Sequence, residues 1–278
     1  MSALDDFSRV RPLCVCVDSD GCAMDTMNIK HFRCFGPCMV EEWGLEAWRE
    51  PILRRWNEIN LFSMTRGINR FKGLAMALSE ISAQYRPIDG IAELSAWAES
   101  APELSNAAVE KMGEKHEIFR KALRWSRAVN ASIERLPQEE IHPFGHVQEA
   151  LAAAHEGADV VVVSSANPEA VRAEWERFGL LPHVDLLCTQ DLGSKAYCIR
   201  RLKEKGYDAI LMCGDAPGDD AAAAENGVLY YPILVNHEAE SWKRFLDEGL
   251  GRFLSGSFDG DYQRSLRDAF AANLAPKK

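Results

Sequence analysis

The sequence predicts an α/β fold: a Rossmann-like parallel sheet core with an inserted α-helical cap domain. From about residue 141, runs rich in Val, Ile and Leu alternate with helical patterns, which is typical of a parallel sheet covered on both faces. Residues 40–140 show only helical periodicity, whereas a single short apolar run precedes them at 12–17. Because that lone strand needs the later sheet to bury it, we expect a core domain from residues 1–26 and 141–278, interrupted by a cap domain from residues 27–140.

The first strand, PLCVCV at 12–17, is followed by the helical block. Trp43, Ala47 and Trp56 stand near helical spacing, and Pro51 marks a break or a new first turn. The period continues over 68–81, Pro87 and Gly90 interrupt it, and the polar segment 102–136 predicts one solvated helix or a pair. No convincing strand is predicted in this block.

Strands and helices then alternate to the end of the sheet. The predicted strands are 158–163, 184–189, 208–215 and 228–235, and the predicted helices between them are 144–157, 168–180, 194–207 and 217–227. Pro168 suits the first turn of its helix. The last forty residues are predicted to be helical.

Composition excludes several classes of function. The formal net charge of −10 disfavours binding to nucleic acid or to an anionic membrane. No apolar run approaches the roughly 20 residues that a membrane span requires. The first ten residues lack a secretory pattern, so a cytoplasmic protein is expected. The eight Cys do not suggest a disulfide scaffold, and a metal site at Cys34 and Cys38 is a minor alternative because no second ligand pair stands at zinc-site spacing.

Polar residues follow the predicted strands at the edge where open parallel sheets bind ligands. Asp18 and Asp20 follow the first strand, Ser164 and Ser165 follow the second, and Lys195 precedes a helix. After the strand at 208–215 come the acids Asp215, Asp219 and Asp220. If the fold is right, these groups share one cleft.

The chemistry of this set is coherent. Several carboxylates cannot lie ionised together without a cation, and oxygen donors suit Mg²⁺ better than zinc. A Ser hydroxyl and a Lys ammonium would hold phosphate oxygens. One Asp can attack phosphorus while a second protonates the leaving oxygen. The absence of G-x-x-x-x-G-K-[ST] excludes a P-loop protein.

These residues resemble the motifs of haloacid dehalogenase-like hydrolases. "DSDGCAMDT" matches the Asp-x-Asp-Gly motif, "VVVVSSANP" the strand that ends in Ser or Thr, Lys195 the Lys ahead of a helix, and "GDAPGDDAAAAENG" the Gly-Asp motif with its further acid. The four matches span the whole α/β part, and the insertion resembles the type-I cap of that family. Asp219 fits the further acid better than Asp220, although the choice stays open, and the spacing to Pro168 favours Ser165 over Ser164.

The resemblance implies a role for each residue in a Mg²⁺-dependent phosphatase that acts on a small phosphorylated metabolite. Asp18 is the nucleophile that becomes an aspartyl-phosphate. Asp20 is the general acid and then the base, and its backbone carbonyl also binds Mg²⁺. Asp18, Asp215 and Asp219 supply carboxylates to the metal, while Ser165 (or Ser164) and Lys195 bind the phosphoryl group.

Alternatives remain open at this point. A phosphosugar mutase would keep all four motifs. A phosphonoacetaldehyde hydrolase-like enzyme would use a cap lysine such as Lys30 or Lys72, but that branch lacks an acid at the position of Asp20. A non-catalytic relative that binds a ligand is the third reading. The sequence predicts neither the substrate nor the oligomeric state.

The cap offers a basic segment, "MTRGINRFKG", with Arg66, Arg70 and Lys72 around two glycines. A flexible basic loop could close over an anionic substrate, so Arg66 and Lys72 are candidate substrate-binding residues. A solvated helix start is the alternative. Asp25 is predicted to be structural, at the exit toward the cap.

Overall fold

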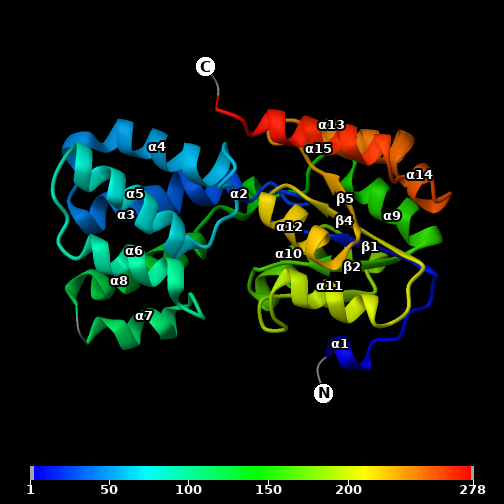
Figure 1. Ribbon diagram of the computed structural model, residues 1–278, viewed down its shortest axis with the longest axis horizontal. Coiled ribbons are helices and arrows are strands. Elements are labelled where there is room, and N and C mark those ends of the chain that lie inside the picture. The colour runs from blue at the N-terminus through cyan, green and yellow to red at the C-terminus, as the bar shows by residue number, and fades with distance from the viewer. Residues whose placement is uncertain (1–2, 115, 277–278) are drawn as a thin grey trace. The chain divides into compact units, whose positions relative to one another are not determined.

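The computed structural model describes residues 3–114 and 116–276 and divides into two compact units. The core unit comprises the residues up to Thr26 and those from Ile141 onward, and the helical unit comprises Met27–Glu140. The core unit is an α/β sandwich around a parallel sheet, so the predicted fold class is confirmed (Figure 1).

Five parallel strands form the sheet in the order β3-β2-β1-β4-β5. Their bounds are β1 Leu13–Val17, β2 Asp159–Val163, β3 Leu186–Cys188, β4 Ala209–Gly214 and β5 Leu229–Pro232. Each coincides with a predicted apolar run. β3 and β5 are shorter than predicted, because they are the two edge strands and their neighbours end opposite Cys188 and Pro232.

The strand order reverses between β1 and β4. Connections from β1 lead outward to β2 and β3, and the chain then returns across β1 to β4 and β5. The register pairs Val17 with Cys213. Asp18 therefore follows directly after the paired end of β1, and Asp215 lies just beyond β4 at the same edge. Such a switch point is where open α/β sheets bind ligands.

Helices cover both faces of this sheet (Figure 1). Helices α11 (Lys195–Lys203) and α12 (Pro217–Asn226) pack against each other, α11 on β2 and α12 on β4 and β5. Helix α9 (Val147–Gly157) packs on β2, and α15 (Asp261–Asn273) packs on β5. The remaining elements are α1 Ala3–Asp6, α10 Pro168–Arg177, the 3-10 turn η4 Leu181–His183, α13 Glu238–Arg244, the π-helical turn η5 Phe245–Gly249 and α14 Leu250–Leu254.

The helical unit contains no strand among its described residues. Its elements are α2 Met27–Lys30, the π-helical turn η1 His31–Phe35, α3 Gly36–Trp43, η2 Glu46–Trp48, α4 Arg49–Leu61, α5 Arg70–Gln84, α6 Ile91–Ser100, α7 Asn106–Gly113, α8 Glu117–Ile133 and η3 Gln138–Glu140. Segment 102–136 is thus a helix pair, and Pro51 lies in the first turn of α4. Helical structure begins at Met27, earlier than the predicted start near residue 40. In the sequence, Gly36 and Pro37 suggest a break between helices, so the helical residues before them are hard to recognise. Pro37 is tolerated because it lies in the first turn of α3.

Aromatic side chains form the centre of the helical unit. Trp56 and Trp125 are fully buried with ring centroids 6.0 Å apart, and Phe35 lies 6.0 Å from Trp125. Both indoles are satisfied: Trp56 Nε1 donates to His31 Nδ1, and Trp125 Nε1 donates to the Phe35 carbonyl, at 3.1 Å in each case. These edge-on rings and their hydrogen bonds join the first segment of the unit to α4 and α8.

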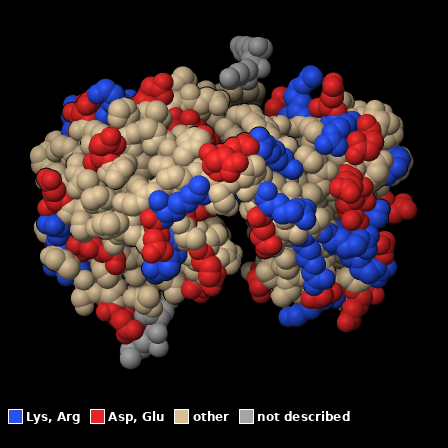
Figure 2. Space-filling view, turned by 180° about the vertical axis from the view of Figure 1, so that it is seen from behind, with Lys and Arg blue, Asp and Glu red and all other residues tan. Residues whose placement is uncertain are grey.

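The surface carries charges of both signs. Figure 2 shows Lys and Arg beside Asp and Glu over the visible face, and many are paired within one helix turn, as Arg120 is with Glu117. Such exposed pairs contribute little to stability. No helix in the described ranges is long and apolar enough to cross a membrane.

Asp159 is a buried acid at the start of β2, at the edge of the sheet opposite the switch-point site, and it is 1% exposed. Its carboxylate accepts hydrogen bonds from the backbone N–H of Val10 (2.8 Å) and Arg11 (3.1 Å) and from the Tyr207 hydroxyl (2.7 Å). Burial, above all, raises the pKa of Tyr207, so its hydroxyl stays a donor. This one carboxylate therefore ties the segment before β1 and the segment before β4 to β2.

We predict that Asp159→Ala lowers the free energy of unfolding by about 2–4 kcal/mol, because three donors lose a charged acceptor in a buried place. Urea unfolding followed by circular dichroism measures the change. Asp208→Ala is the matched control, since Asp208 is exposed and should change stability by less than about 0.5 kcal/mol. Equal effects of the two substitutions would contradict this role for Asp159.

Candidate functional site

Three buried aspartates meet at the switch point of the sheet. Asp18 follows β1, Asp215 follows β4, and Asp219 lies in the first turn of α12. One carboxylate oxygen of each lies within 4.8 Å of those of the other two. Asp215 and Asp219 have no exposed surface, and Asp18 is 5% exposed. Sequence reasoning named all three, and the fold brings them together.

The loop after β1 holds Asp18 in place. The Asp18 N–H donates to the Cys213 carbonyl at 3.0 Å, which extends the β1–β4 ladder by one residue. The next carbonyl, that of Ser19, accepts the N–H groups of Cys22, Ala23 and Met24, so the chain turns sharply. Gly21 makes this turn possible with a φ of 80°, a conformation that L side chains rarely adopt.

The turn after β4 places Asp215 and Asp219. Asp219 Oδ2 accepts the Ala216 N–H at 3.0 Å, so the acid closes the first turn of α12. A Cβ at position 214 would lie only 2.4 Å from Cβ of Asp219. Only glycine therefore fits before Asp215, which gives the Gly-Asp pair of this motif a steric reason.

Lys195 connects two of the three acids. It begins α11, where the Ser194 hydroxyl accepts the Tyr197 N–H and so caps the helix. Its Nζ lies 2.8 Å from Asp18 Oδ2 and 2.6 Å from Asp219 Oδ1. Burial alone would lower the pKa of Lys195, but Asp18 and Asp219 outweigh burial and raise this pKa above its ordinary value. The two carboxylates therefore favour the charged form of Lys195.

Asp18 responds in the opposite way. Burial raises its pKa most strongly; Lys195 lowers it, and the Asp219 and Asp215 carboxylates raise it further. The net result is a pKa well above the usual range for an aspartate. One ammonium thus does not compensate three buried carboxylates, and the group has room for further positive charge.

This donor set fits a hard divalent cation. All three ligands are carboxylate oxygens, which Mg²⁺ and Ca²⁺ prefer over the nitrogen and sulfur ligands of zinc. No other trio of His, Cys, Asp or Glu side chains this close occurs within residues 3–114 and 116–276. The minor alternative of a metal at Cys34 and Cys38 gains no third ligand in that part of the chain.

Asp20 lies beside this group rather than in it. The Thr26 hydroxyl donates to Asp20 Oδ1 at 2.5 Å, which orients the carboxyl group. Thr26 itself is fully buried. Thr26 stands within the DSDGCAMDT motif, but sequence reasoning assigned it no role. The only signal for its contact with Asp20 was a hydroxyl residue six positions after that acid.

Trp175 is a second residue that sequence reasoning missed as part of the site. Its indole Nε1, on α10, donates to the Ser19 hydroxyl at 2.9 Å, and both residues are completely buried. Ser19 lies between Asp18 and Asp20, so this bond ties the acid loop to the helix that follows β2. The sequence carries no local signal for a contact between residues this distant.

The two serines after β2 differ in exposure. Ser164 is 4% exposed, and its hydroxyl accepts the Ala166 N–H at 3.2 Å within its own turn. Ser165 is exposed to solvent. Asn167, not a serine, caps α10 by accepting the Ala170 N–H at 3.1 Å. The choice between the serines as phosphate ligands stays a prediction.

The side chains of the neighbouring acids Asp219 and Asp220 point to different partners. Asp220 forms an ion pair with Arg267 of α15, with Nη2 2.7 Å from Oδ1, and it is not part of the three-acid group. The structure therefore groups Asp219, rather than Asp220, with Asp18 and Asp215.

The basic segment of the helical unit is a hydrogen-bonded turn followed by a helix start. Thr65 Oγ1 donates to the Ile59 carbonyl at 2.6 Å, and the Asn69 side chain caps α5. Arg66 is 3% exposed, and its Nη1 donates to the Leu61 carbonyl at 2.9 Å. Lys72 is exposed. Residues 69–72 therefore form the start of a helix, as the alternative interpretation of this segment expected. Substrate binding by Arg66 and Lys72 stays a prediction.

Asp25 lies where the chain leaves the core unit. Its N–H donates to the His142 carbonyl at 2.9 Å, and the Phe144 N–H donates to the Ala23 carbonyl at 3.0 Å. The outgoing and returning segments are thus joined by their backbones. This agrees with a structural position for Asp25.

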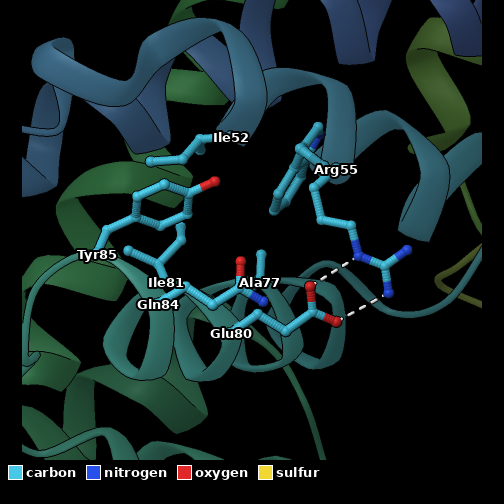
Figure 3. A pocket seen from close by; sticks show the side chains of 8 residues that line it. Ile52, Arg55, Ala77, Glu80, Ile81, Gln84 and Tyr85 are labelled. Carbon is cyan, nitrogen blue, oxygen red and sulfur yellow. Dashed lines mark hydrogen bonds and ion pairs between the residues drawn. The ribbon is translucent and has the colours of Figure 1, made fainter.

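A small hollow between α4 and α5 offers no rival site. Figure 3 shows Ile52, Ile81 and Tyr85 on one side of it, with the Arg55–Glu80 ion pair at its rim. Its volume of about 20 Å³ holds about one water molecule. An organic ligand does not fit there.

Comparison with known proteins relates this chain to others by structure alone. No protein-family model and no curated protein matches the sequence. A haloacid dehalogenase-like hydrolase from Streptococcus pneumoniae is similar with a TM-score of 0.50 and 12% identity, over 83% of this chain and 90% of that one. A candidate phosphoglycolate phosphatase from Lactobacillus delbrueckii subsp. bulgaricus is similar with a TM-score of 0.51 and 13% identity, over 94% of this chain and 99% of that one. The chain therefore has the fold of the haloacid dehalogenase-like hydrolases.

Proposed function

We propose that this protein is a Mg²⁺-dependent phosphatase that hydrolyses a small phosphorylated metabolite through an aspartyl-phosphate intermediate. The observation that carries the proposal is the meeting of Asp18, Asp215 and Asp219 with Lys195 at the switch point of the sheet. Fold similarity alone would not carry it, because one fold hosts many functions.

Asp18, Asp215 and Asp219 would hold Mg²⁺ through carboxylate oxygens, joined by the backbone carbonyl of Asp20. When bound, the ion supplies positive charge that lets the buried acids stay ionised and that offsets the charge of the phosphoryl oxygens. Lys195 already lies between Asp18 and Asp219 and would bind a further phosphoryl oxygen.

The reaction needs two carboxyl groups with different tasks. The Asp18 carboxylate attacks phosphorus, and the bond to the leaving oxygen breaks as Asp20 donates its proton to that oxygen. The Asp20 carboxylate then takes a proton from water, whose oxygen attacks the aspartyl-phosphate and releases phosphate, which restores Asp18. The Thr26 hydroxyl, 2.5 Å from Asp20 Oδ1, supports this role because it orients the acid.

Ser165 is the serine that we assign to phosphoryl binding. Its exposure leaves the side chain accessible, whereas the hydroxyl of Ser164 is buried in the turn after β2. Both lie at the carboxyl end of the strand next to β1.

We predict that Asp18→Asn reduces the turnover of p-nitrophenyl phosphate in Mg²⁺ by about 10³-fold or more, because the amide is not a nucleophile. The initial rate of nitrophenolate release measures it. Asp220→Asn is the matched control, since it makes the same chemical change at an acid that pairs with Arg267 outside the three-acid group. Turnover that survives Asp18→Asn would rule out the aspartyl-phosphate. A phosphosugar that is isomerised without release of phosphate would instead identify a mutase.

A second prediction concerns metal binding and is independent of turnover. Mg²⁺ at about 100 times its dissociation constant should stabilise the wild-type protein by about 2.7 kcal/mol, and Asp215→Asn should remove most of that gain. In EDTA, where no Mg²⁺ is bound, the melting temperature of Asp215→Asn should equal or exceed that of the wild type, because the substitution neutralises one of three buried like charges. Melting by differential scanning fluorimetry measures both. A Mg²⁺ shift that persists in Asp215→Asn would place the metal elsewhere.

A further inference from the structure

Arg70 belongs to the arginines of the helical unit that donate to neutral acceptors, as Arg86 does to the Trp43 carbonyl. Arginines there commonly pair with a glutamate, as Arg55 does with Glu80 and Arg127 with Glu110. Arg70 Nη1 instead donates to three neutral acceptors: Ser126 Oγ at 3.0 Å, the Ser126 carbonyl at 3.5 Å and Asn130 Oδ1 at 2.7 Å. Within residues 3–114 and 116–276 no carboxylate pairs with Arg70.

The surroundings of Arg70 make an uncompensated charge unfavourable. Its guanidinium lies over the Phe35 ring, 5.1 Å from the centroid. Burial lowers the pKa of Arg70, and no neighbouring acid opposes that effect. The cation–π contact recovers part of the lost hydration, but it supplies no countercharge. A cation that is partly removed from water without an acid partner is stabilised further by a bound anion.

The geometry of Arg70 leaves one edge of the guanidinium available. Nη1 is occupied by Ser126 and Asn130, whereas Nε and Nη2 have no acceptor among the described residues. This pair of N–H groups is the fork that binds a carboxylate or a phosphate through two parallel hydrogen bonds. Arg70 is neither fully buried nor fully exposed, so part of its side chain meets solvent.

Neighbouring side chains fix the orientation of that fork. The Ser126 hydroxyl donates to Asn106 Oδ1 at 2.7 Å, so its lone pair faces Arg70. Asn130 must present its Oδ1 to Arg70, since a guanidinium only donates, and its Nδ2 therefore remains a donor. The guanidinium Nε and Nη2 groups can only donate, which favours a ligand rich in acceptors.

We propose that Arg70 is the centre of an oxyanion site in the helical unit, which binds the carboxylate or phosphate of a small molecule through Nε and Nη2. Phe35, Ser126 and Asn130 hold the guanidinium in place. This site does not depend on the proposed phosphatase activity, because every residue in it belongs to the helical unit.

The test is an NMR titration of the full-length protein, ¹⁵N-labelled at tryptophan, in EDTA at constant ionic strength. The Trp125 indole donates to the Phe35 carbonyl and reports on the Arg70 site, whereas the Trp175 indole donates to Ser19 and reports on the acid site of the core unit. The probes are inorganic phosphate and acetate in separate arms. Trp125→Phe and Trp175→Phe assign the two signals.

We expect phosphate, acetate or both to shift the Trp125 signal saturably in the wild type. Arg70→Gln should weaken that binding by about tenfold or more, because a charged two-bond contact is lost. Arg127→Gln makes the same change at a paired, exposed arginine of α8 and should leave the affinity unchanged. Arg70→Lys keeps the positive charge but lacks the two parallel N–H groups, so it should also bind the anion more weakly. This variant replaces Arg70→Gln in the test if Arg70→Gln does not fold.

Three outcomes would overturn the proposal: no shift of Trp125 with either probe, equal affinities in the wild type and Arg70→Gln, or equal losses in Arg70→Gln and Arg127→Gln. A shift confined to Trp175 would overturn this site while supporting phosphoryl binding in the core unit. The probe that binds with the higher affinity, phosphate or acetate, identifies the class of ligand.

Discussion

The site depends on one ammonium group held between two buried carboxylates. Lys195 Nζ lies within 3 Å of oxygens on both Asp18 and Asp219, and Asp215 adds a third acid with no exposed surface. Such a group is costly to bury and persists only where the surrounding fold holds it. The fold does so by placing β1 beside β4 in the centre of the sheet, so that the acid loops after both strands emerge at one edge.

Much of the fold could be predicted because each strand of the sheet is a short apolar run that can be recognised in the local sequence. In the core unit, β1 and β2 lie inside the sheet and are covered on both faces, so β1 is a run of Leu, Val and Cys and β2 carries four consecutive Val after Asp159. The start of the helical unit could not be predicted in the same way. His31–Phe35 forms a π-helical turn whose spacing departs from the usual helical period, and Gly36–Pro37 reads as a break.

The candidate site shows a similar division. Asp18, Asp215, Asp219 and Lys195 were predicted because each follows or precedes an element that the sequence reveals. The choice between Asp219 and Asp220 was not, because it depends on Arg267, which approaches from the last helix of the chain. The bond from Trp175 to Ser19 depends likewise on tertiary packing. Burial of Arg66 was also outside the reach of sequence reasoning, because an arginine in a polar, glycine-flanked segment looks solvated.

The position of the insertion has a consequence for how the chain folds. β1 ends at Val17, but its partner β2 begins only at Asp159, with the whole helical unit between them. Loop-closure entropy grows slowly with length, by about 0.6 kcal/mol per doubling, so a compact insert that folds by its own local contacts adds little to the cost of joining these strands. The hydrogen bonds between Ala23 and Phe144 and between Asp25 and His142 bring the two connections together at the core. β1 is thus synthesised before its partners in the sheet, and the acid group that includes Asp18 is complete only after β4 has paired with β1.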